Sequence, residues 1–144
     1  MPVTPVVAQL NAFLRDETAA VDTYNHAIER VRDSVARSQL IQCQRSHATR
    51  IEALQRRIQR FGGTPSTGSA VWGAISRLLD GGAGLFGVRA AVVALQEGEE
   101  RVLRNYQLNV MRLDADSRSF VEKELLPSQQ LTSQSLAALK TTMR

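Results

Sequence analysis

Apolar residues recur at steps of three and four along four long stretches of the chain, a period typical of amphipathic α-helices. The first helix is predicted to start at Thr4, which caps it, and Pro5, whose missing N–H costs nothing at the first helical position. Its apolar positions continue to Val31. No stretch alternates with the period of two that a half-buried strand needs, so the sequence predicts an all-α protein.

Three further helices follow the first. The second is expected to begin near Asp33 or Ser34 and to end at Gly62, because glycine is favoured in the position just after a helix. The third spans about residues 88–113 and the fourth about residues 117–143. Each has apolar residues on one face, so all four helices are expected to pack around a common core.

Glycine and proline mark the places where the helices break. Eight of the nine glycines lie between residues 62 and 87, which predicts one long glycine-rich crossover between the second and third helices, with a short helix around residues 71–79. Pro127 falls inside the fourth helix and is predicted to kink it. With short connections elsewhere, residues 1–144 are expected to form a single domain, an up-down-down-up four-helix bundle.

The composition is typical of one globular domain. The chain has 144 residues, 43% of them apolar, which suffices for a core without disulfides. Its single cysteine, Cys43, can form neither an intramolecular disulfide nor a cysteine-based zinc cluster. The first residues lack the basic and apolar regions of a signal peptide, and charges interrupt the most apolar stretch, residues 70–95. We therefore expect a cytoplasmic protein without a membrane span.

Arginine accounts for most of the positive charge. The net charge is +4, and eight arginines but only three acids lie from residue 29 to residue 60. Such a run forms either a solvated helix face with i,i+4 ion pairs or a face for an acidic partner, for which Arg45, Arg56 and Arg60 are the candidates. Nucleic acid is not expected as the partner, because no aromatic residue stands among these arginines to stack on bases.

Each apolar stripe is interrupted near its middle by polar residues. In the first helix Glu17 precedes Tyr24 by seven residues, and in the third helix Glu99 precedes Tyr106 by the same distance. Seven residues make two helical turns, so each carboxylate shares a helix face with a phenol. The segments DETAAVDTY and GEERVLRNY therefore form an internal E-x6-Y repeat, which predicts two helix pairs related by a pseudo-twofold axis.

The second and fourth helices carry polar pairs at corresponding places. His47 follows Gln44 by three residues, and Thr132 follows Gln129 by three. Since residues three apart lie on one helix face, the four helices are expected to bring polar side chains together inside an apolar core. Buried carboxylates must be paired or protonated, and hydrogen bonds from His47 and Gln129 to the two glutamates would satisfy them without a metal ion.

These patterns resemble the ferritin-like superfamily, whose four-helix bundles hold two metal ions with a Glu from each of two helices and an E-x-x-H motif from each of the other two. The segments LNAFLRDETAAVDTY, RIQRFGGTP, ALQEGEERVLRNYQ and ELLPSQQ are similar to an uncharacterised bacterial branch of small ferritin-like proteins. The resemblance covers nearly the whole chain. It implies a ferritin-like four-helix bundle of undefined role.

The metal ligands that the resemblance implies are kept only in part. Glu17 and Glu99 match the single glutamates, His47 is the histidine of a motif that begins with Gln44 in place of Glu, and the segment starting at Gln129 keeps neither ligand. Two carboxylates and one imidazole carry too little negative charge for two divalent cations. If a metal binds, the resemblance implies a degenerate dimetal site for iron or zinc formed by Glu17, His47, Glu99, Gln44 and Gln129.

Three functions stay open from the sequence. The first is a non-catalytic or weakly metal-binding bundle with Glu17, His47 and Glu99 as an inner polar layer. The second is a dimetal ferroxidase or oxidase-like stress protein, which would recruit Glu97 and Glu100 as further ligands. The third is an interaction module that uses the arginine-rich face of the second helix. Bundles of this kind often pair, so a homo-oligomer also stays open.

Overall fold

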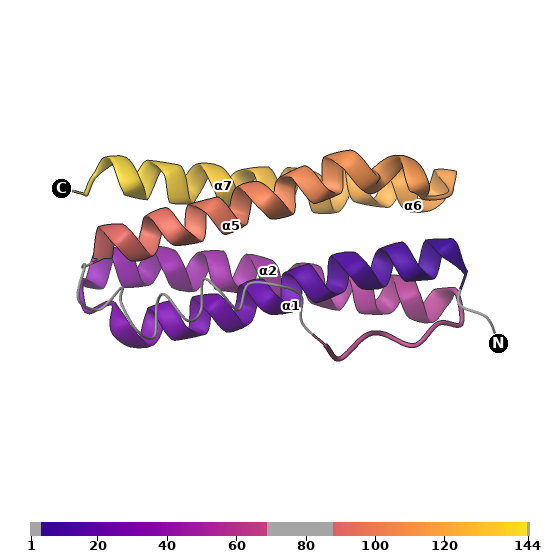
Figure 1. Cartoon of the computed structure of the whole chain (residues 1–144), viewed down its shortest axis with the longest axis horizontal. Helices are drawn as coiled ribbons and strands as arrows, with labels where there is room; N and C mark the ends of the chain where they lie inside the picture. Colours follow the sequence, from indigo (N-terminus) through magenta and orange to yellow (C-terminus); the bar gives the residue numbers. More distant parts are fainter. Residues whose placement is uncertain (1–3, 69–87, 144) are drawn as a thin grey trace.

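The computed structural model describes residues 4–68 and 88–143, which fold into long helices (Figure 1). The helices are α1 (Pro5–Arg30), α2 (Ser34–Arg60), α5 (Val88–Asn109), α6 (Ala115–Phe120) and α7 (Leu126–Thr141). A 3-10 turn, η2 (Val110–Arg112), follows α5, and a π-helical stretch, η3 (Val121–Leu125), joins α6 to α7. No strand occurs in the described part of the chain, so the prediction of an all-α fold is confirmed.

Local sequence signals set the ends of the first two helices. The Thr4 hydroxyl accepts a hydrogen bond from the backbone N–H of Val7 at 3.2 Å, and the Asp33 carboxylate accepts one from that of Ala36 at 2.8 Å. Gly62 has a φ of +73°, the left-handed conformation that is typical of the residue after a helix. The predicted ends of both helices are therefore confirmed.

The fourth rod, made of α6, η3 and α7, begins earlier than predicted and is irregular beside Pro127, where the sequence predicts a kink. It begins earlier than residue 117, because Asp114 caps it by accepting a hydrogen bond from the backbone N–H of Ser117 at 3.3 Å. Its irregularity is the π-helical stretch η3, which ends just before Leu126 and Pro127. Proline has no N–H to donate to the preceding turn, and a π-helical turn accommodates the interrupted hydrogen bonding.

The four rods pack as two antiparallel pairs, α1 with α2 and α5 with α7 (Figure 1). Helix α1 also packs against α5, and α2 against α7, so each rod has two neighbours. Helices α2 and α5 run in the same direction, which is the up-down-down-up order that the sequence predicts. The predicted short helix around residues 71–79 and most of the glycine-rich crossover fall in 69–87, outside the described residues.

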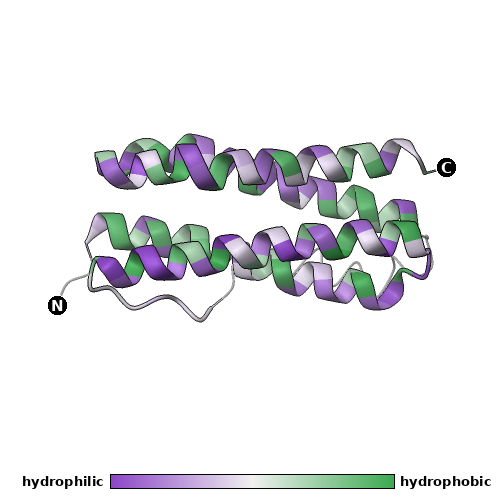
Figure 2. Ribbon diagram, turned by 180° about the vertical axis from the view of Figure 1, so that it is seen from behind, coloured by the Kyte–Doolittle hydropathy of each residue, from purple (hydrophilic) through white to green (hydrophobic). Residues whose placement is uncertain are grey.

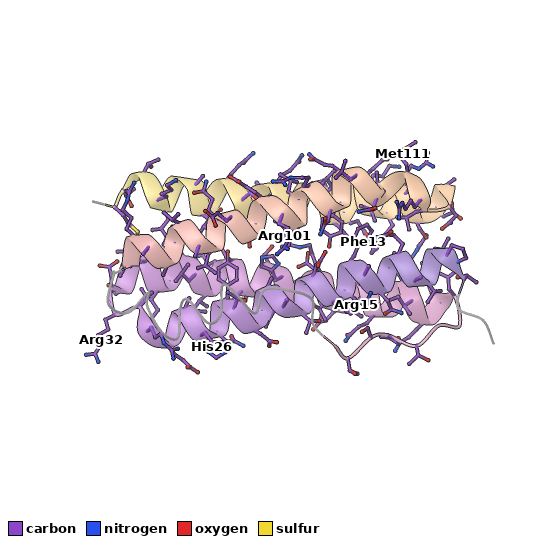
Figure 3. All side chains as sticks on the ribbon, in the orientation of Figure 1. Phe13, Arg15, His26, Arg32, Arg101 and Met111 are labelled. Atoms are coloured by element: carbon purple, nitrogen blue, oxygen red, sulfur yellow. The ribbon has the colours of Figure 1, made fainter. Side chains whose placement is uncertain are left out.

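The core runs along the bundle and is made of the predicted apolar stripes. Hydrophobic and hydrophilic residues are interspersed along each helix (Figure 2). The buried hydrophobic residues include Leu10, Leu40, Leu95 and Val121. Phe13 lies between α1 and α5, with its ring centroid 4.6 Å from that of Tyr106 (Figure 3). None of the described helices combines the length and the apolar character needed to cross a bilayer.

Candidate functional site

Five polar side chains meet in the middle of the core, and each of the four rods contributes at least one. They are Glu17 from α1, His47 and Arg50 from α2, Glu99 from α5 and Gln129 from α7. Arg50 is 2% exposed and the other four are fully buried. We call these five residues the ionic ring, because their hydrogen bonds form a closed cycle.

The histidine joins the two glutamates on one side of the ionic ring. His47 Nδ1 lies 2.6 Å from Glu17 Oε2, and His47 Nε2 lies 2.5 Å from Glu99 Oε1. Both imidazole nitrogens therefore face carboxylate oxygens, which accept but cannot donate. Only the doubly protonated imidazolium donates through both nitrogens, so this arrangement favours a positively charged His47.

Gln129 and Arg50 close the cycle on the other side. The amide nitrogen of Gln129 donates to Glu99 Oε2 at 2.8 Å, while its carbonyl oxygen accepts from Arg50 Nη2 at 2.8 Å. Arg50 Nε then donates to Glu17 Oε1 at 3.0 Å. Each member of the ionic ring thus contacts the next, and two cationic side chains face two carboxylates.

The two tyrosines of the internal repeat also donate hydrogen bonds to the glutamates, each to the glutamate of the other helix. The Tyr24 hydroxyl on α1 donates to Glu99 Oε1 on α5 at 2.9 Å, and the Tyr106 hydroxyl on α5 donates to Glu17 Oε1 on α1 at 2.7 Å. The crossing follows from the antiparallel packing of the two helices (Figure 1). The predicted E-x6-Y repeat therefore has a structural meaning, because each half supplies the phenol for the carboxylate of the other half.

The ionic ring shifts the pKa of its members in opposite directions. Burial alone would lower the pKa of His47, but the carboxylates of Glu99 and Glu17 raise it to about 9. Burial would raise the pKa of Glu17, but the charges of His47 and Arg50 lower it to about 2. Glu17 is therefore a carboxylate and His47 an imidazolium at neutral pH.

Arg50 also connects the ionic ring to a group of hydroxyls. Its Nη1 donates to Ser46 Oγ at 2.7 Å and to Ser128 Oγ at 2.6 Å, and lies 3.4 Å from Thr132 Oγ1. Its Nη2 approaches His47 Nδ1 to 2.9 Å. This close approach of two cations is offset by the carboxylates that face both of them.

Some residues predicted for the site lie elsewhere. The Gln44 amide is half-buried and donates to the Asn25 side chain at 3.3 Å on the flank of α1 and α2, because the inward direction of α2 passes through His47 and Arg50 instead. Glu97 and Glu100, the alternative ligands of an oxidase, are exposed on α5. Gln44 is thus a wrong prediction for the inner layer, whereas Glu17, His47, Glu99 and Gln129 are brought together as predicted.

Arg50 is the member of the ionic ring that the sequence analysis does not identify, because it lies within the arginine-rich run of the second helix. Two signals could have found it. The steps from Cys43 to His47, to Arg50 and to Leu54 are four, three and four, so Arg50 continues the buried stripe. In addition, two buried carboxylates need two cations, and His47 supplies only one.

Comparison with known proteins places the chain in a family. Residues 5–111 match the family described as a domain of unknown function (DUF2383), which covers more than half of the chain. The chain belongs to this family. The matched region contains α1, α2 and α5, and hence every charged member of the ionic ring, whereas Gln129 lies beyond it. No curated protein and no solved structure matches the chain.

The donor set of the ionic ring decides which ions it could hold. Over residues 4–68 and 88–143, no group of three or more His, Cys, Asp and Glu side chains is placed to hold a metal ion. Each oxygen of Glu17 and Glu99 already accepts a hydrogen bond from a protein donor, and both nitrogens of His47 are engaged. Most of the lone pairs that a metal would need are therefore directed at protein hydrogens.

Proposed function

We propose that this chain is a ferritin-like four-helix bundle whose inner layer is a metal-independent ion network, and that it acts as a non-catalytic protein rather than as an oxidase. The observation that carries the proposal is the position of Arg50. Its guanidinium is 2% exposed and lies 3.0 Å from Glu17, in the layer where the ferritin-like resemblance implies metal ions. Arginine keeps its charge at any pH that a folded protein experiences.

The charge balance of the ionic ring supports this proposal. Arg50 and a protonated His47 supply two positive charges, and Glu17 and Glu99 supply two carboxylates. A divalent cation would have to displace these hydrogen-bond donors and would then lie beside the fixed charge of Arg50, which repels it. The residues present therefore do not fit a two-metal centre, and we infer that His47 and Arg50 take the place of the cations.

The oxidase alternative has less support. It requires further carboxylates beside Glu17 and Glu99, and the two candidates, Glu97 and Glu100, are exposed on the outer face of α5. Glutamine at position 129 offers only a neutral carbonyl, and that carbonyl accepts from Arg50. The metal hypothesis then reduces to weak binding of a single divalent ion, which experiments can distinguish from a metal-independent network.

Metal analysis and thermal unfolding of the full chain test the proposal. We expect no stoichiometric iron or zinc after purification, and a Tm that neither a chelator nor excess Fe²⁺ under anaerobic conditions changes. A bound ion would reveal itself, because a ligand at a hundred times its Kd stabilises the folded state by about 2.7 kcal/mol. Stoichiometric metal together with a Tm that falls on chelation would contradict the proposal, and oxygen consumption with Fe²⁺ would favour the oxidase.

A variant of Arg50 sharpens this test. Arg50→Gln removes the fixed charge but keeps a polar side chain, so it frees Glu17 for other cations. If Arg50 is what excludes metal, the variant gains a Tm increase with Zn²⁺ or Fe²⁺ that the unmodified chain lacks. The matched control is Arg45→Gln on the exposed face of α2, which should respond to metal as the unmodified chain does.

A further inference from the structure

A cavity of about 810 Å³ lies between α2 and the rod formed by α6, η3 and the start of α7. This volume is within the range of pockets that hold small organic molecules. Its lining includes the buried Arg50 and the half-buried Ser128 from the edge of the polar network, together with arginines from the last turns of α2, of which Arg56 and Arg60 are exposed. The π-helical stretch η3 contributes several lining residues, and π-helical turns are frequent at functional sites.

The lining of the cavity carries an excess of positive charge. Besides Arg50, it contains Arg56, Arg57, Arg60 and Lys123 against the two acids Asp116 and Glu124. Among the residues that the structure describes, Arg56, Arg60 and Lys123 form no ion pair with an acid. Apart from Arg50, the four cations of the lining therefore exceed its two acids by two positive charges, which matches the charge of a phosphate monoester.

One wall of the cavity combines a guanidinium with an aromatic ring. Arg57 Cζ lies 5.3 Å from the centroid of the Phe120 ring and 5.9 Å from that of Phe61. Arg57 Nε is buried but has no hydrogen-bond partner, whereas buried polar groups are normally satisfied. Ala53 and Leu125 add apolar surface beside Phe120. This wall of the cavity thus places the charged guanidinium of Arg57 beside a flat apolar surface.

We propose that this cavity binds a small organic phosphate whose phosphate group is held by Arg57, Arg60 and Lys123 and whose aromatic or apolar part lies against Phe120. Guanidinium groups recognise phosphate through paired hydrogen bonds, so the arginines of the lining suit a phosphate ligand. Of the three arginines predicted to form a face for an acidic partner, Arg56 and Arg60 line the cavity, whereas Arg45 lies outside it. The assignment does not depend on the role of the ionic ring, which is left intact in every variant below.

Titration of the full chain with phenyl phosphate, inorganic phosphate and benzyl alcohol, followed by calorimetry and NMR, tests the assignment. We expect phenyl phosphate to bind about tenfold more tightly than inorganic phosphate, and benzyl alcohol to bind less tightly than either. Raising the salt concentration from about 50 to about 200 mM should weaken phenyl phosphate binding, since the contact is ionic. Lack of binding by both phosphates at the lower salt concentration would overturn the proposal.

Substitutions in the lining locate the site. Arg57→Gln and Lys123→Gln should each weaken phenyl phosphate binding about tenfold, and Phe120→Leu should remove its advantage over inorganic phosphate. Arg45→Gln, on the same helix but outside the cavity, is the control and should bind as the unmodified chain does. Equal loss in Arg45→Gln would show that the general charge of α2, rather than the cavity, binds the anion.

A second probe separates a small ligand from a nucleic acid. A single-stranded oligonucleotide presents the same phosphate chemistry, but its binding would extend over the whole face of α2 and would depend steeply on salt. If the oligonucleotide binds tightly and Arg45→Gln weakens it as much as Lys123→Gln does, the proposal of a small organic phosphate is overturned. If Arg57→Gln does not fold, Lys123→Gln at its exposed position still tests the site.

Discussion

Arg50 and Arg57 lie two turns apart on α2, but their surroundings differ in kind. Arg50 is 2% exposed, and each of its three nitrogens has a partner in the ionic ring or among the hydroxyls beside it. Arg57 is half-buried in the wall of the cavity, contacts two aromatic rings, and has a buried Nε without a partner. One arginine is fully satisfied by the protein, and the other is not.

The difference shows how the same residue type serves two purposes in one helix. A charge that the fold has surrounded with acceptors contributes to the folded state, because removing it leaves a buried carboxylate unpaired. A guanidinium that the fold satisfies only in part, like Arg57 with its unpartnered Nε, should contribute less to folding, and we propose that it binds a ligand. Substitutions in the ionic ring should therefore change stability, and substitutions in the cavity should change binding.

The largest effect on stability is expected from Arg50→Met. Methionine has a similar length but no charge. Glu17 therefore loses its closest permanent cation while its carboxylate stays buried. Breaking a buried ion pair in this way costs about 3–5 kcal/mol. Urea unfolding near pH 6 measures the loss, and Arg45→Met, at an exposed position of the same helix, should stay within about 0.5 kcal/mol.

A double variant distinguishes a lost interaction from a general disturbance of packing. If Arg50 acts through Glu17, the pair Glu17→Gln and Arg50→Met should cost clearly less than the sum of the single substitutions. Additive costs would mean that Arg50 stabilises the bundle mainly by filling space, and the distinction drawn between Arg50 and Arg57 would be lost.

The ionic ring should also govern the pH dependence of stability. The pKa of His47 is raised from 6.5 to about 9 on folding, so its contribution is complete below pH 6.5 and is lost as the pH rises through 9. The pKa of Glu17 is lowered from 4.5 to about 2, so its contribution is complete above pH 4.5 and is lost as the pH falls through 2. Maximum stability is therefore expected between pH 4.5 and 6.5.

The alkaline limb is the more accessible test. Between pH 6.5 and 9 the free energy of unfolding should fall by on the order of 3 kcal/mol, and urea unfolding at a series of pH values measures it. His47→Gln should flatten this limb, whereas His26→Gln should keep it. The pKa of Cys43 is raised from 9.0 to about 11 by burial and by Glu99, so it contributes only above pH 9. A limb that is unchanged in His47→Gln would argue against a charged His47.

The fold could be predicted largely from local signals, and the start of the fourth rod differs from its prediction because two local signals compete there. Thr4, Asp33 and Gly62 fix the ends of the first two helices through contacts with their immediate neighbours. The predicted start of the fourth rod lies too far along the chain, because Asp114 and Ser117 are both residue types that cap helices. The choice between them depends on tertiary packing, which the local sequence does not contain.

Only the two glutamates of the ionic ring, which belong to the internal E-x6-Y repeat, could be predicted firmly from the sequence. The E-x6-Y spacing places Glu17 and Glu99 inward, since two independent segments agree on the same face. Gln44 and Arg50 each lie three residues from His47, on opposite sides of it, and the resemblance to a metal-binding motif favoured the wrong one. Charge neutrality of the buried layer would have favoured Arg50.

Smaller effects are expected from the crossed tyrosines, which test whether the two halves of the ionic ring are equivalent. Tyr24→Phe and Tyr106→Phe each remove one hydrogen bond to a buried carboxylate that keeps its other partners. Each should cost about 1–2 kcal/mol in urea unfolding. Because the repeat relates the two positions, their costs should agree within about 0.5 kcal/mol. A much larger cost at one position would show that the two halves are similar in geometry but not in their contribution to stability.

The smallest effect on stability is expected from Arg57→Met, which completes the contrast with Arg50→Met. The substitution gives up contacts of the guanidinium with Phe61 and Phe120, worth about 0.5–1 kcal/mol at partly exposed sites. It also removes a buried Nε without a partner, which relieves a penalty of about 1–3 kcal/mol.

The methionine side chain keeps an apolar chain against the two phenylalanine rings. These terms oppose each other, so the net change in unfolding free energy should be near zero or slightly favourable. A loss as large as that of Arg50→Met would mean that Arg57 is satisfied within the fold and is not held ready for a ligand.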